Sequence, residues 1–190
     1  MGQYYKIAFK HDGPPVVNNR QVESADYAYV MMKLMEHSYL GNYLCKAVAK
    51  EISGHPTRIA WVGDYADEVK VATHGDLSYG DVWGDEESPH VFRQAKRFSY
   101  KKKWLVNHDK KVCISFDKWI EGYKDKEWPI FPVSILTAIG NGRGGGDYFG
   151  NAMARVGSWT WDLIEITKKK PEGYEVLDFT FHYGKESDAD

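Results

Sequence analysis

The sequence predicts a single α+β domain, built mostly from an antiparallel sheet with one main amphipathic helix and long loops rich in Gly and Asp. Several short segments rich in β-forming residues are bounded by turn residues. One segment, residues 40–52, repeats its apolar residues at helical spacing. The 190 residues are enough for one well-cored domain and few for two. We therefore expect one globular domain over 1–184 and a polar tail over 185–190.

The first half of the chain is predicted to hold strands and the main helix. Residues 3–10 and 57–62 are rich in β-forming side chains, and turn residues follow both. Residues 27–35 are apolar without a clean period, and a strand is favoured there. In the helix over 40–52, Ser38 is a candidate N-cap and Gly54 suits the C-terminal cap. Its apolar face is expected to carry Leu40, Tyr43, Leu44, Ala47, Val48 and Ile52.

The second half is predicted to consist mainly of strands joined by turns and loops. Residues 69–89 form a long Gly- and Asp-rich loop, a length that is often functional, and 90–98 a short helix. Residues 104–106 and 111–116 form a hairpin around the turn that contains His108 and Asp109. The remaining predictions are a strand or short helix over 133–139, a strand over 158–167, a turn over 168–173 and a strand over 174–183.

Composition excludes several classes of protein. The net charge of −2 gives no general attraction to nucleic acid or to anionic membranes, so any polyanion site has to be local. We expect no long nucleic acid partner, and the run Lys101-Lys102-Lys103 is most simply a solvated charge run. The two cysteines are too few for a disulfide scaffold, and no apolar run approaches the ~20 residues that span a bilayer. The chain is expected to be cytoplasmic and not bound to a membrane.

Residues 139–151, reading IGNGRGGGDYFGN, are the strongest candidate for a ligand-binding segment. The glycines formally match the dinucleotide fingerprint, but no helix follows at once, and the Walker Lys is missing. Glycines also permit positive φ in a tight connection, for which one or two suffice. Five glycines within 140–146 instead favour close approach of a ligand to bare backbone, whose amides form an anion-binding concavity.

The residues expected to hold an anion are therefore Gly142, Arg143, Gly144, Gly145 and Gly146. Arg143 would be the bidentate partner of a phosphate or carboxylate. Asp147, directly after the loop, would hold a ribose hydroxyl, a metal ion or a water molecule.

Other candidate residues have both a functional and a structural interpretation. His37 is a candidate acid/base residue, or an ordinary histidine at an element boundary. Asp64 would bind Mg²⁺ or a sugar at a strand end, or cap a turn. Trp159 and Trp161 share a face of the predicted strand, where they would stack on a base, as Tyr148 would, or pack in the core. No spacing indicates a zinc site, and no cofactor is required beyond a weakly indicated Mg²⁺.

Several motifs are scattered along most of the chain, at residues 1–6, 33–39, 58–67, 107–108, 140–148 and 156–159. Together they resemble an uncharacterised family of small proteins of bacteria and their phages, many of which begin MGQYYK. The Gly-rich loop is the most specific part of the resemblance. The resemblance implies a single domain and raises a role in phage–host conflict, but it implies no established activity.

These observations lead to one principal hypothesis and two alternatives. The chain is expected to bind a phosphorylated small molecule, a nucleotide or nucleotide-derived signal, through the Gly-rich loop, with His37, Asp64 and Asp147 along the sugar side. One alternative is a hydrolase or transferase acting on such a nucleotide, with His37 or Asp147 as acid/base. The other is a protein-binding inhibitor module, in which aromatic residues and the long loop form an interface.

Overall fold

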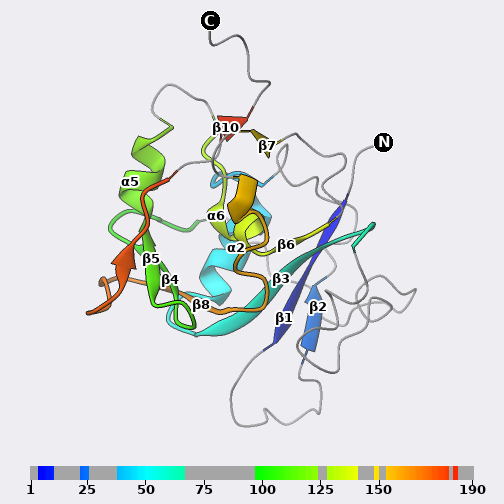
Figure 1. Ribbon diagram of the computed structural model, residues 1–190, viewed down its shortest axis with the longest axis horizontal. Helices are drawn as coiled ribbons and strands as arrows, with labels where there is room; N and C mark the ends of the chain where they lie inside the picture. Colours follow the sequence, from blue (N-terminus) through cyan, green and yellow to red (C-terminus); the bar gives the residue numbers. More distant parts are fainter. Residues whose placement is uncertain are drawn as a thin grey trace, which may run out of the picture.

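The computed structural model confirms the predicted fold class, a single α+β domain with a mostly antiparallel, open sheet (Figure 1). It describes residues 4–10, 22–25, 38–66, 97–123, 128–140, 148–149, 153–179 and 182–183.

The main sheet contains seven strands in one path and an eighth strand beside it. The path runs β2 (Val22–Ala25), β1 (Tyr5–Lys10), β3 (Thr57–Gly63), β8 (Leu163–Thr167), β4 (Trp104–Asn107), β5 (Val112–Ser115) and β9 (Glu175–Val176). The eighth strand, β6 (Ala138–Ile139), pairs with β3 in parallel, and β9 is parallel to β5. β7 (Tyr148–Phe149) and β10 (His182–Tyr183) form a separate antiparallel pair.

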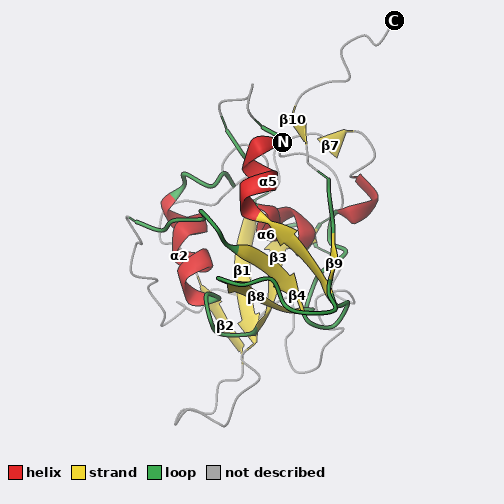
Figure 2. Cartoon of the chain, turned by 90° about the vertical axis from the view of Figure 1, so that its left-hand side faces the viewer, coloured by secondary structure: helices red, strands yellow, loops and turns green. Residues whose placement is uncertain are grey.

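Three α-helices are described: α2 (Tyr43–Glu51), α5 (Phe116–Glu121) and α6 (Pro132–Leu136), together with the 3₁₀ helix η2 (Met153–Arg155). The sheet curves around α2 and α6, with β4 and β5 on one side and β1 and β2 on the other (Figure 1). α2 lies alongside the strands (Figure 2). All three helices contribute buried side chains to the main hydrophobic core, which explains why they gather on one face of the sheet.

Alternate residues of the central strands supply two hydrophobic clusters. In β3, Ile59 and Trp61 belong to the main core, whereas Ala60 and Val62 belong to a smaller cluster. Because successive strand residues point to opposite faces, the two clusters lie on opposite faces of the sheet. β3 is therefore buried on both sides, which makes it the structural centre of the domain.

The main helix is where it is predicted, but its cap and its face differ in detail. Asn42, and not Ser38, is the N-cap: its side chain accepts a hydrogen bond from the Leu44 N–H at 2.7 Å. Tyr43, predicted on the buried face, is 55% exposed. Cys45 is buried instead, because the core covers a wider arc of the helix than the apolar stripe indicates. Gly54 adopts the expected positive φ of 80°, but its N–H donates to Ile166 O on β8.

Most of the predicted strands are present. β1, β3 and the β4–β5 hairpin lie where the sequence places them, and 133–139 divides into α6 and β6. The strand predicted over 158–167 is wrong in its first half, because residues 156–161 form turns before β8 begins. The strand predicted over 174–183 is only two short strands, β9 and β10. The segments 27–35, 69–89 and 90–96 lie outside the described residues, and residues 97–98 are not helical.

Candidate functional site

The Gly-rich loop begins where two parallel strands end together. Trp61 and Val62 of β3 pair with Ala138 and Ile139 of β6, so the chain leaves both strands at the same end of the sheet. β3 ends at Gly63 and is followed by the turn at 64–65, and β6 is followed by Gly140. The predicted site residues at 142–147 and His37 lie outside the described residues, as does the side chain of Tyr148 on β7.

Asp64 lies at this shared strand end, where it fixes the turn after β3. Its carboxylate Oδ1 accepts a hydrogen bond from the Tyr4 N–H at 3.1 Å, and its own N–H donates to Tyr4 O at 2.9 Å. These bonds tie the end of β3 to the start of β1. Both bonds are made to Tyr4 and neither to an N–H of the turn, so the interpretations of Asp64 as a turn cap and as a ligand-binding residue both stay predictions.

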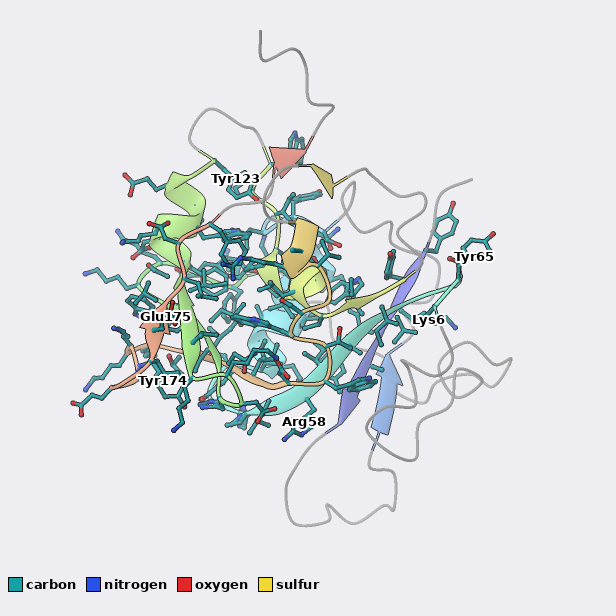
Figure 3. The ribbon with its side chains drawn as sticks, viewed as in Figure 1. Lys6, Arg58, Tyr65, Tyr123, Tyr174 and Glu175 are labelled. Carbon is teal, nitrogen blue, oxygen red and sulfur yellow. The ribbon has the colours of Figure 1, made fainter. Side chains whose placement is uncertain are left out.

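An exposed aromatic ring lies next to Asp64 and was missed by sequence reasoning. Tyr65 is 51% exposed, although a glycine-bounded turn gives no special reason to single it out. Lys6 of β1 pairs with Val62 and lies at the same end of the β1–β3 pair, away from Arg58 (Figure 3). This end of the sheet therefore carries an exposed tyrosine just after β3 and a lysine on the neighbouring strand β1.

The two tryptophans predicted to share a strand face do not do so. Trp159 lies in a turn and packs in the main core, with 2% exposed. Trp161 packs in the smaller cluster on the other face, with 3% exposed. The chain reverses between them, because Trp161 adopts a positive φ of 60°. Neither ring is open to a ligand from solvent, and core packing accounts for both.

A polar network lies at the opposite end of β3, around the β4–β5 turn. Arg58 donates from Nη1 to Asp109 Oδ2 at 2.7 Å and to Trp161 O at 2.9 Å. Asp109 Oδ2 also accepts the Leu163 N–H at 3.0 Å. The hydrogen bond from Arg58 holds the pKa of the Asp109 carboxyl below its usual range, with partial burial opposing and the Leu163 N–H assisting. The turn is thereby attached to both β3 and β8.

Asp162 extends the same network. Its Oδ2 accepts a hydrogen bond at 2.7 Å from the fully buried Asn107 side chain and pairs with Lys110. The side-chain oxygen of Asn107, Oδ1, accepts a hydrogen bond from the Lys110 backbone N–H at 2.9 Å. A buried amide with both of its ends bonded is a satisfied structural group.

His108 links three elements in a chain of hydrogen bonds. Its Nε2 lies 3.0 Å from Glu165 Oε2 on β8, and its Nδ1 lies 3.1 Å from the Tyr174 hydroxyl, just before β9. A carboxylate, an imidazole and a hydroxyl in this order can move a proton along the chain. Both ring nitrogens are engaged, however, so the imidazole has none left for a ligand. These hydrogen bonds hold the segment before β9 against the β4–β5 hairpin, which is a structural role for His108.

No metal centre is indicated by the described side chains: none of them forms a group of three or more His, Cys, Asp or Glu arranged to hold an ion. Likewise, no helix in this part of the chain is long and apolar enough to cross a membrane. Comparison with protein-family models, with curated proteins and with solved structures finds no match to the chain. The function therefore has to be argued from the site itself, and the family resemblance stays a prediction.

Proposed function

We propose that the chain binds a phosphorylated small molecule, a nucleotide or a nucleotide-derived signal, at the end of the sheet where β3 and β6 finish. The parallel pairing of Trp61 and Val62 with Ala138 and Ile139 carries the proposal. It brings the origin of the Gly-rich loop beside the turn at Asp64 and Tyr65. In open sheets with parallel strands, ligands bind outside the carboxyl ends of the strands, where loops diverge.

Within this proposal, the loop holds the phosphate. The bare amides around Gly142 and Gly144–Gly146 and the guanidinium of Arg143 supply the donors that a phosphate accepts. Asp147 and His37 retain their proposed places along the sugar, and Mg²⁺ would enter only with the phosphate. A role of this binding in phage–host conflict is part of the proposal and rests on the sequence resemblance alone.

Two roles change from the sequence hypothesis. Asp64 supports the site through its bonds to Tyr4, so we assign it to positioning the turn. The stacking role passes from Trp159 and Trp161, which are buried, to Tyr65, which is exposed in the turn after β3, and Tyr148 keeps the stacking role predicted from the sequence. A tyrosine face stacks on any base, so this contact adds affinity without selecting one nucleotide.

Thermal denaturation against a panel of ligands tests the proposal. The panel contains inorganic phosphate, ATP, GTP, NAD⁺ and a cyclic dinucleotide. A ligand at a hundred times its Kd stabilises by about 2.7 kcal/mol, which raises the Tm of a domain of this size by roughly 5–11 °C. Arg143→Ala is expected to lose the shift. Arg97→Ala, which removes an exposed arginine elsewhere, is the matched control and keeps it. Absence of stabilisation by every anion in the panel contradicts the proposal.

The same panel separates binding from the two alternatives. For a hydrolase or transferase, chromatography after long incubation reveals product, and His37→Ala or Asp147→Ala abolishes it. For a pure binding protein, the ligand is recovered unchanged. For an inhibitor module, no small ligand stabilises the chain, and a stoichiometric protein partner is recovered instead.

A further inference from the structure

Two lysine runs that are far apart in the sequence meet at one end of the β4–β8 pair. Lys101–Lys103 immediately precedes β4, and Lys168–Lys170 immediately follows β8. These strands are antiparallel, and their terminal residues Trp104 and Thr167 are directly opposed. The Cα atoms of opposed residues in such a pair lie about 4.5–5.5 Å apart, so the runs emerge side by side. We call these six residues the lysine patch.

Ion pairs with the described residues do not neutralise the positive charge of the lysine patch. Five of its six lysines are exposed, and Lys103 is half-buried, with its Nζ 5.1 Å from the centre of the Phe98 ring. Among the described residues, none of the six ammonium groups forms a salt bridge. Six like charges gathered on a chain of net charge −2 repel one another, which a partner of opposite charge would relieve.

The backbone of both runs is held in place. The Lys102 N–H donates to both carboxylate oxygens of Asp117 at 3.1 Å, and the Phe116 N–H donates to Lys103 O at 3.0 Å. The Thr167 hydroxyl donates to Lys169 O at 2.7 Å. The Asp117 carboxylate is thus bonded to the backbone N–H of Lys102. The lysines therefore project from fixed turns, which lowers the entropy lost on binding.

The residue that joins the first lysine run to β4 is the aromatic Trp104, which is opposed to Thr167 of β8. Trp104 is half-buried, and it lies on the sheet face away from the main core, because the next residue, Leu105, points into that core. The large hydrophobic residues that are exposed in the described chain, Tyr43, Tyr65, Ile120 and Trp128, belong to other segments. Trp104 thus offers a stacking surface for a base, and none of the four exposed large hydrophobic residues of the described chain lies in the patch.

We propose that the lysine patch binds the phosphate backbone of a single-stranded nucleic acid, with Trp104 stacking on one base. Basic residues along a groove or edge with an interposed aromatic ring are the usual means of binding single strands without sequence preference. The net charge of −2 describes the chain as a whole and does not apply to this local surface. The patch lies along β4 and β8, apart from the β3–β6 end, so the inference does not depend on the proposed nucleotide site.

Fluorescence anisotropy with a labelled oligothymidylate tests the proposal on the full chain. The affinity should fall steeply with salt, with a log–log slope of about −4 if all six lysines contact phosphates. Glutamine keeps the side-chain length while removing the charge. The variants are K101Q/K102Q, K168Q/K169Q and the control K46Q/K111Q, in which Lys111 matches Lys102 in its positive φ. Each patch variant should reduce the slope by about 1.4, whereas the control should leave it unchanged.

A second comparison tests the stacking role of Trp104. An abasic oligomer of the same length should bind wild type about 5- to 150-fold more weakly than oligothymidylate. Trp104→Leu should bind both oligomers alike, and thermal denaturation verifies that it folds. Equal loss in the control variant, no binding at low salt, or binding only to phosphatidylserine vesicles or to polyglutamate would each overturn the proposal.

Discussion

Replacing Gly157 with alanine probes the contact that holds β6 in place. Gly157 has a φ of 70°, and its N–H donates to Ile135 O at 2.9 Å. A Cβ added there would lie 2.4 Å from Ala138 O, a backbone atom of β6. Real Cβ atoms do not approach an oxygen so closely, so either β6 or the turn must move. Since β6 leads into the Gly-rich loop, the substitution also disturbs the proposed ligand site.

The size of the effect follows from three contributions. A left-handed conformation destabilises an alanine in the folded state by about 1–2 kcal/mol. Alanine also lowers the conformational entropy of the unfolded chain, which stabilises the fold by about 0.4–1 kcal/mol. Forcing an added methyl group into packed surroundings costs about 1–3 kcal/mol more. Gly173→Ala is the matched control, because its φ is 75° and nothing lies within 4 Å of the added Cβ. We expect Gly157→Ala to lose about 1–3 kcal/mol more stability than Gly173→Ala.

Urea unfolding followed by far-UV circular dichroism measures the difference. Both variants should show the wild-type m-value, so that the shifts in midpoint report stability alone. The nucleotide-induced rise in Tm should also shrink in Gly157→Ala and persist in Gly173→Ala. If the two variants unfold at the same urea concentration, the close packing of Gly157 against β6 is refuted.

Three further predictions concern other parts of the structure. Hydrogen bonding to Arg58 lowers the pKa of Asp109 in the folded state. The ionised carboxylate therefore stabilises the fold modestly at pH values above its pKa in the unfolded chain, about 3.9. This stabilisation is lost as the pH falls through the lower pKa of the folded state. Urea midpoints should therefore fall less on acidification in Asp109→Asn than in wild type, and an identical fall contradicts the pairing. Tyr100→Phe should leave stability unchanged or raise it by up to about 1–3 kcal/mol in urea unfolding, because it removes a buried hydroxyl that has no hydrogen-bond partner among the described residues. A clear loss would show that the hydroxyl has a partner. Burial raises the pKa of both Cys45 and Cys113, so neither thiol should react with DTNB until urea unfolds the chain, and prompt reaction of native protein would contradict their burial.

Local patterns were enough to predict the elements whose sequence carries its own signal. The hairpin of β4 and β5 follows from two β-rich segments around an Asn- and Asp-containing turn, and α2 follows from its apolar period. The failures arise where tertiary contacts override the pattern. Trp161 lies within the stretch 158–167, which alternates like a strand. Its N–H donates to Ile59 O and its carbonyl oxygen accepts from Arg58, and these bonds hold it in a left-handed turn.

The geometry of the candidate sites depends on contacts between distant residues, which a single sequence does not contain. Val62 and Ile139 are far apart in the sequence but are paired in the sheet. This pairing brings the turn at Asp64 and Tyr65 toward the start of the Gly-rich loop. Two lysine runs that each resemble an ordinary solvated segment become one patch through the opposition of Trp104 and Thr167. The sequence alone identifies the Gly-rich loop as chemically unusual, but it does not predict which residues lie near the loop in the fold.

The most direct test of the central claim is a ¹⁵N–¹H correlation spectrum of the chain, titrated with the panel nucleotide that raises the Tm most. The account predicts that amide shifts gather at Gly63–Tyr65 and from Gly140 through the Gly-rich loop. Shifts confined to the lysine patch, or spread over the surface without these two segments, would contradict a ligand site at the shared end of β3 and β6.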